Sequence, residues 1–188
     1  CLMANPDLVA RCLAAMQKES DAPVTVKSRI GINDQDSYEF LRSFVDPLVE
    51  AGCRKFVVHA RIAILEGLSP KENRSVPPLV YERVYRLKDD YPALEIVLNG
   101  GLTSIASVDA ALQRVDGAMI GRQAYHQPWF LAELEAQRNN GWQSPTRRAV
   151  VEKMLAYAPP FVYSPVTGIK SKTGVKAEGW LIGLGVTP

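Results

Sequence analysis

Cysteine is scarce in this chain of 188 residues, which contains three: Cys1, Cys12 and Cys53. Their spacing fits no metal-binding motif, and an odd number argues against a framework of disulfide bonds. Thiols that stay unpaired are typical of a reducing compartment. We therefore expect a cytoplasmic protein that holds neither structural disulfides nor a metal ion.

Long apolar runs and a large excess of one charge are also missing. No stretch approaches the ~18 consecutive apolar residues that indicate a membrane helix, and no basic segment followed by an apolar one marks a signal peptide. The net charge is +2, from 22 Lys and Arg against 20 Asp and Glu. This balance excludes a protein that binds nucleic acid through general basicity, so any RNA contact has to come from a local patch.

Helix and strand signals alternate along residues 1–128. Apolar residues recur at helical spacing in the ranges 6–18, 37–51, 79–90 and 104–113. Short apolar runs that predict buried strands occupy 24–30, 56–58, 94–98 and 117–120. This alternation predicts an α/β fold of parallel strands with right-handed crossovers. The lengths of the units leave two architectures open: half of an eight-stranded (β/α)8 barrel, or most of a small open α/β sheet.

The remaining residues differ from the repeated units. Two helices are expected within 129–157, at 129–134 and 145–157, and they form a short helical extension. Residues 158–188 are rich in Gly and Pro, which predicts an irregular tail with little helix. The chain starts with Cys1, and its first Met is Met3, so we expect it to begin within a longer protein.

Glycines follow two consecutive predicted strands. Asn99, Gly100 and Gly101 follow the third strand, and Gly121 and Arg122 follow the fourth. In (β/α)8 barrels the loops after the last two strands often bind a phosphate group. Ordinary strand-ending turns also use glycine, but two such pairs on consecutive strands favour a phosphate site.

Two more polar residues are candidates for a binding site. Lys27 stands within a strand predicted to be buried, where a lysine is costly unless it is paired. It is explained by an ion pair, by a position at a strand tip in water, or by contact with a bound group. His59 stands at a strand end. A lone histidine is usually a core residue with its hydrogen bonds satisfied, but this position favours a role in binding.

The segment after His59 is too long for an ordinary connector. It carries Arg61, Lys71 and Arg74. Charge clusters usually form a solvated face, whereas the same residue types also make phosphate contacts with nucleic acid. If these cations bind RNA, they form the local patch that the balanced net charge requires.

Five sequence pieces occur in one order: VKSRIG (from Val26), VHAR (from Val58), GLSPKENR (from Gly67), NGG (from Asn99) and IGR (from Ile120). Together they resemble the A-type tRNA-dihydrouridine synthases, over about residues 1–157. Members of that family are FMN-dependent TIM barrels that use NADPH to reduce uridines in the tRNA D-loop. The resemblance implies that residues 1–128 form the C-terminal half of such a barrel and that the N-terminal half is missing. It gives no pattern for residues 158–188.

The resemblance also implies roles for individual residues. Lys27 lies beside the flavin ring and stabilises its reduced form, and His59 contacts FMN. The residues at the phosphate are Asn99, Gly100, Gly101, Gly121 and Arg122. In the family, the residues matching Lys71 and Arg74 contact tRNA, and we group Arg61 with them. His126 is left unassigned.

The catalytic cysteine of the family lies in a GCPS-like motif that is absent from this chain. We assign its role to none of Cys1, Cys12 and Cys53, so we expect the chain alone to be inactive. Two other interpretations stay open. One is a non-redox, phosphate-binding barrel isomerase or lyase, for which only Lys27 could be the base. The other is a non-catalytic RNA-binding or inert fragment.

Overall fold

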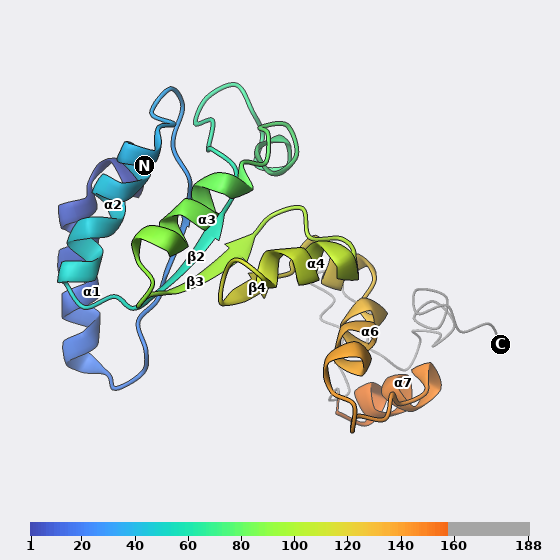
Figure 1. Cartoon of the computed structure of the whole chain (residues 1–188). Helices are drawn as coiled ribbons and strands as arrows, with labels where there is room; N and C mark the ends of the chain where they lie inside the picture. Colours follow the sequence, from blue (N-terminus) through green and yellow to red (C-terminus); the bar gives the residue numbers. More distant parts are fainter. Residues whose placement is uncertain (158–188) are drawn as a thin grey trace, which may run out of the picture. The chain divides into compact units, whose positions relative to one another are not determined.

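The computed structural model describes residues 1–157. Its centre is a parallel sheet of four strands in the order β1-β2-β3-β4. The strands are β1 (Val26–Arg29), β2 (Lys55–His59), β3 (Glu95–Asn99) and β4 (Gly117–Met119). Helices precede and connect them (Figure 1): α1 (Pro6–Glu19), α2 (Tyr38–Glu50), α3 (Tyr81–Asp90) and α4 (Ile105–Leu112). The predicted alternation of helices with parallel strands is confirmed.

Helices α1 and α2 begin at side chains that accept backbone hydrogen bonds. Asn5 accepts from the amide of Leu8 at 3.2 Å, with Pro6 at the first helical position of α1. Ser37 accepts from the amide of Phe40 at 3.0 Å at the start of α2. The predicted strand 24–30 is longer than β1, because the ladder with β2 begins only where Val26 pairs with Phe56.

Alternate strand residues face opposite sides of the sheet. Phe56, Val58, Ile96 and Leu98 are fully buried, as expected of a face that helices cover. On the other face, Val57 and Val97 keep 6% and 8% of their surface exposed, and Lys27 is exposed. The core therefore lies between the sheet and its helices, and the opposite face is the more open one.

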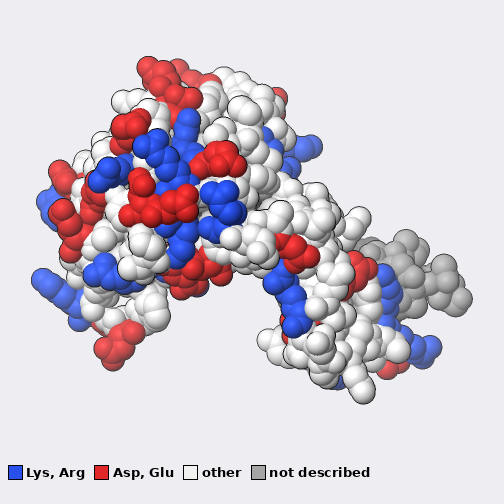
Figure 2. Space-filling view, in the orientation of Figure 1, with Lys and Arg blue, Asp and Glu red and all other residues white. Residues whose placement is uncertain are grey.

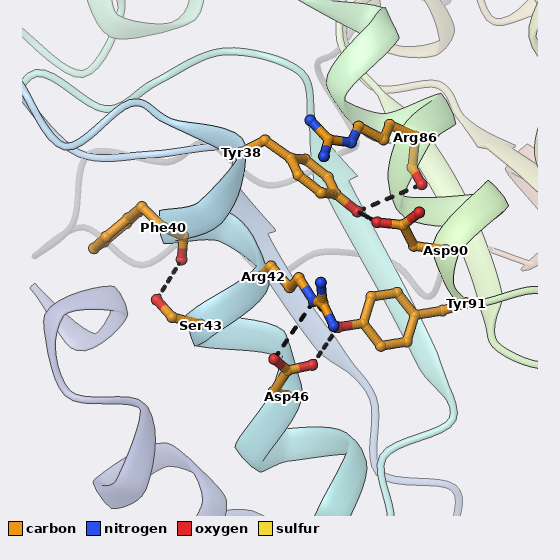
Figure 3. Close-up of polar contacts among 8 residues, drawn as sticks. All are labelled: Tyr38, Phe40, Arg42, Ser43, Asp46, Arg86, Asp90 and Tyr91. Atoms are coloured by element: carbon orange, nitrogen blue, oxygen red, sulfur yellow. Dashed lines mark hydrogen bonds and ion pairs between the residues drawn. The ribbon is translucent and has the colours of Figure 1, made fainter.

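The outer surface carries charges of both signs. Figure 2 shows Lys and Arg interleaved with Asp and Glu across the face that bears α2 and α3. Figure 3 shows contacts between charged residues of α3 and Tyr38 of α2. The Tyr38 hydroxyl donates to Asp90 at 2.6 Å, and the guanidinium carbon of Arg86 lies 3.9 Å from the centre of the Tyr38 ring. Burial, followed by the hydrogen bond to Asp90, raises the pKa of Tyr38. These contacts join α2 to α3 through the Tyr38 side chain, whose hydroxyl and ring each meet a charged residue of α3.

Two connections lie side by side beyond the carboxyl ends of β1 and β2, at the top of Figure 1. They are the β1–α2 loop and the long β2–α3 loop. A parallel bridge pairs Ile32 with Ala63. The amide of Asn33 donates to the carbonyl of Ala63 at 2.8 Å. The amide of Ala63 in turn donates to the carbonyl of Gly31 at 2.9 Å. The strand ladder is thus continued into the loops, which fixes the long loop against the shorter one.

The chain divides into two compact units, Cys1–Gly121 and a second that starts at Arg122. The described part of the second unit contains three helices: α5 (Arg122–His126), α6 (Trp129–Arg138) and α7 (Arg147–Tyr157). Helix α5 was not predicted, whereas the helices expected within 129–157 are present. Arg147 lies over the ring of Trp129, with 4.5 Å between its guanidinium carbon and the ring centre. The predicted irregular tail, 158–188, lies outside the described residues.

Candidate functional site

Polar residues meet on one rung of the sheet. The register pairs Arg29 with His59, His59 with Asn99, and Asn99 with Met119. Because the strands are parallel, these residues close their strands at the same edge. Ligands of open and closed α/β folds bind at this carboxyl edge. The edge therefore holds two of the polar residues singled out in the sequence, His59 and Asn99.

Asn99 joins Lys27 to the last strand. The Lys27 ammonium donates to Asn99 Oδ1 at 3.0 Å, and Asn99 Nδ2 donates to the carbonyl of Met119 at 2.8 Å. The side chain that pairs with Lys27 is thus the neutral amide of Asn99 rather than a carboxylate. Burial of the ammonium lowers the pKa of Lys27, and the positive charge of Arg29 lowers it further. Asn99 therefore holds the Lys27 ammonium beside the carboxyl end of β3.

Gly100 and Gly101 form a turn that only glycine fits. Their φ angles are +113° and +68°, a region that other residues rarely adopt. A Cβ on Gly100 would lie 2.6 Å from His59 Cδ2, and one on Gly101 would lie 2.4 Å from Leu79 Cδ1. The Tyr81 hydroxyl donates to the carbonyl of Gly100 at 2.6 Å. The turn is therefore packed closely against His59, which is 8% exposed.

Gly121 and Arg122 differ from that cluster. A Cβ on Gly121 would meet no atom of the described residues within 4 Å, so the space beside it is open. Arg122 begins α5 and belongs to the second unit. The cluster of Lys27, His59 and the Asn99 turn is therefore built from residues of the first unit alone.

Lys71 and Arg74 flank Asn73 at a single turn of helix within the long loop, η2 (Glu72–Arg74): Lys71 immediately precedes the turn, and Arg74 is its last residue. The Ser69 hydroxyl donates to the Glu72 carboxylate at 2.6 Å, and the Ser69 amide donates to it at 2.8 Å. These hydrogen bonds, first that of the hydroxyl and then that of the amide, lower the pKa of Glu72. Lys71 and Arg74 are exposed, so their charges are presented outward from a capped turn.

Arg61 differs from these two cations, because it is half-buried and its guanidinium donates to the carbonyl of Pro77. Arg29 donates from Nη1 to the carbonyls of Ile62, at 3.1 Å, and Asn73, at 2.9 Å. Burial lowers the pKa of Arg29, and the charges of Arg61 and Arg74 lower it further. Several positive charges are therefore close enough at this edge to repel one another, which favours an anionic ligand.

Three contributors were missed in the sequence: Asn73, Tyr81 and the Ser69–Glu72 cap. The cap was detectable, because Ser-x-x-Glu is the spacing of a capping box. Asn73 and Tyr81 act through partners distant in sequence, which no local pattern indicates.

The described residues contain no helix long and apolar enough to cross a membrane. Within the same 157 residues, no group of three or more His, Cys, Asp and Glu side chains is arranged to hold a metal ion. Cys53 is buried, and its Sγ lies 3.4 Å from the carbonyl of Lys55, at the start of β2. Cys1 and Cys12 are exposed at and near the N-terminus. Cys53 is therefore at the strand end opposite to His59.

The model of the dihydrouridine synthase (Dus) family matches residues 1–163. The chain belongs to the dihydrouridine synthase family. The match covers all the described residues, 1–157, and runs six residues past Tyr157, where we expected the resemblance to end. Membership in this family favours a synthase over the isomerase or lyase alternative.

Individual relatives are similar over most of the chain. The tRNA-dihydrouridine(20/20a) synthase of Shewanella oneidensis is 54% identical over 158 residues, which are 84% of this chain and 47% of that protein. The synthase of the same name from Pseudomonas putida is 59% identical over 137 residues, 73% of this chain and 41% of its own length. The chain thus spans about half the length of the curated relatives it matches.

Proposed function

We propose that this chain is the C-terminal half of an A-type, FMN-dependent tRNA-dihydrouridine synthase. Its four strands would be the last four of a (β/α)8 barrel, and a preceding segment would supply the first four. We call the two halves together the complete synthase. It would reduce uridine to dihydrouridine in the tRNA D-loop with NADPH as reductant, at the positions 20 and 20a that name the relatives.

The hydrogen bond from Lys27 to Asn99 is the observation that carries this proposal. Two residues that lie 72 positions apart belong to two different motifs of the resemblance. They meet at the carboxyl edge of the sheet, and the His59 ring packs against the turn that follows Asn99. An accidental likeness of short motifs would not require their polar side chains to meet on one edge.

The residues present fit a flavin phosphate and ring. Lys27 supplies a positive charge, successive glycines follow Asn99, and the space beside Gly121 is open. When bound, FMN supplies the hydride that is added to C6 of uridine. Lys27 would stabilise negative charge on the ring, and Asn99 would hold the ammonium in place. His59 would pack against the cofactor from the neighbouring strand.

A proton at C5 of uridine has to come from an acid, which the resemblance identifies as a cysteine. Cys53 is buried at the start of β2, and burial raises the pKa of its thiol. Cys1 is the first residue of the chain, and Cys12 lies on α1. We propose that all three are bystanders and that the donor belongs to the preceding half. A non-catalytic RNA-binding fragment remains the alternative for the chain by itself.

Arg61, Lys71 and Arg74 would contact the tRNA backbone. Lys71 and Arg74 are exposed at the capped turn, and Arg61, which is half-buried, donates to the carbonyl of Pro77 in the same loop. The loop lies beyond the carboxyl ends of the strands, so a bound tRNA would reach the same edge as the cofactor (Figure 1).

Titration of the complete synthase with FMN tests the phosphate assignment. Arg122→Ala removes a charge-assisted contact worth about 1.5–3 kcal/mol, which corresponds to roughly 10- to 150-fold weaker binding. Arg148→Ala is the matched control, because Arg148 is an exposed arginine of the same unit that pairs with Glu152 at 2.9 Å. Equal FMN affinity in the parent and Arg122→Ala would show that Arg122 does not bind the phosphate.

A further inference from the structure

The long β2–α3 loop is organised by one half-buried side chain, that of Asn73. Its Oδ1 accepts from the amide of Ile64 at 2.8 Å. Its Nδ2 donates to the carbonyls of Ile64, at 2.7 Å, and Leu68, at 3.3 Å. One amide thus closes the loop on itself across nine residues, and both of its functional groups are used.

The same residue is fastened to the sheet through its backbone. The carbonyl of Asn73 accepts from Arg29 Nη1 at 2.9 Å, and the same nitrogen reaches the carbonyl of Ile62 at 3.1 Å. Arg29 is the last residue of β1, two positions from Lys27. A second side chain, that of Asn33, accepts from the amide of Leu65 at 2.8 Å. The loop is therefore tied to β1 and its following turn at several points.

Asn73 stands between Lys71 and Arg74 on the capped turn. We propose that Asn73 is a positioning residue for RNA binding: it holds the loop in the conformation in which Lys71 and Arg74 contact the tRNA backbone, and it makes no contact with RNA itself. This inference rests on the proposed function of the same loop. Its physical basis is that a loop ordered before binding does not have to be ordered by the ligand.

Replacement by alanine should separate positioning from contact. Asn73→Ala removes the hydrogen bonds of the side chain to Ile64 and Leu68 and leaves every charge of the loop in place. Binding then has to order two cationic side chains that the parent loop already holds in place, so tRNA affinity should fall about tenfold. The dependence on salt should not change, because the same phosphates are contacted once the complex forms. Lys71→Ala with Arg74→Ala should instead lower the salt slope by about 0.7 to 0.9 for each phosphate that is no longer neutralised.

The experiment measures binding of an unmodified tRNA transcript to the complete synthase at several salt concentrations, in a double-mutant cycle. The cycle joins Asn73→Ala with the pair Lys71→Ala and Arg74→Ala. If Asn73 acts through these cations, Asn73→Ala has no further effect once both are removed. Ser75→Ala is the control, because the Ser75 hydroxyl on the same turn only donates back to the carbonyls of Lys71 and Glu72. Hydrogen exchange of residues 61–76 should rise in Asn73→Ala and FMN content should stay unchanged.

Two results overturn the inference while the RNA assignment survives. One is a loss of affinity by Asn73→Ala that persists without Lys71 and Arg74. The other is unchanged affinity in Asn73→Ala when the pair of alanines weakens binding. If the pair of alanines itself leaves tRNA affinity unaltered, the proposed RNA contact is wrong, and the inference falls with it.

Discussion

Replacing Gly100 by alanine tests the packing at the end of β3. The φ angle of +113° is unfavourable for any residue with a Cβ, and such backbone strain costs about 1–3 kcal/mol. The new methyl group would also lie 2.6 Å from His59 Cδ2 and 3.0 Å from Leu79 Cδ2. Crowding of this kind in a packed site costs about 1–3 kcal/mol. We therefore expect Gly100→Ala to lower the free energy of unfolding by about 2–6 kcal/mol in total.

Two other glycines separate these contributions. Gly67 has a φ of +82°, but a Cβ there would meet no atom of the described residues within 4 Å. Gly67→Ala should therefore cost only the backbone strain, about 1–2 kcal/mol. Gly121 has neither feature, and Gly121→Ala should change stability by less than about 0.5 kcal/mol. Urea unfolding of the complete synthase, followed by far-ultraviolet circular dichroism, gives the order of the three variants.

The order matters more than the absolute values. If Gly100→Ala unfolds at the same urea concentration as Gly67→Ala, the close contact of His59 with the turn does not exist. Gly121→Ala also distinguishes the two interpretations of the glycine pairs, which are ordinary strand-ending turns and a phosphate site. Turns required by the fold alone predict that Gly121→Ala is silent in every assay, whereas a phosphate site predicts weaker FMN binding at unchanged stability.

Three further predictions concern the chain as a whole and its loop. The 188-residue chain with NADPH, FMN and unmodified tRNA should form no dihydrouridine, and robust turnover would show that one of its own cysteines is the acid. Within the described sheet, the outer edges of β1 and β4 have no neighbouring strand, so the isolated chain should self-associate in sedimentation experiments; a monomer that melts cooperatively would favour a complete open sheet instead. The lowered pKa of Glu72 means that its cap stabilises the loop above the ordinary value of 4.5 and loses this effect as the pH falls through the lowered value. Hydrogen exchange of residues 69–76, corrected for the intrinsic effect of pH, should therefore rise in acid in the parent but not in Glu72→Gln.

Much of the fold could be predicted because its causes are local. The spacing of apolar residues and caps such as Asn5 and Ser37 set the helices. The strands follow from short apolar runs, although pairing rather than apolarity decides where β1 starts. Helix α5 was missed because five residues are too few for a periodic signal.

The candidate site was predictable only in part, because its residues meet across long stretches of sequence. Motif positions nominated Lys27 and Asn99, but only the folded chain shows that one donates to the other. Asn73 was overlooked because its partner Arg29 is 44 positions away. Arg122 was grouped with the glycines by order along the chain, whereas the structure assigns it to a separate unit.

The continuation of the strand ladder into the loops has a consequence for how the long loop could be exchanged between related proteins. Ile32 pairs with Ala63, and Arg29 and Asn33 hold the backbone of the neighbouring loop. A recombination that carried residues 61–76 alone into another barrel would leave these bonds behind, and the transplanted segment would lose its shape. The structural module is therefore discontinuous in the sequence: residues 29–33 have to accompany residues 61–76 for the transplanted loop to keep its shape.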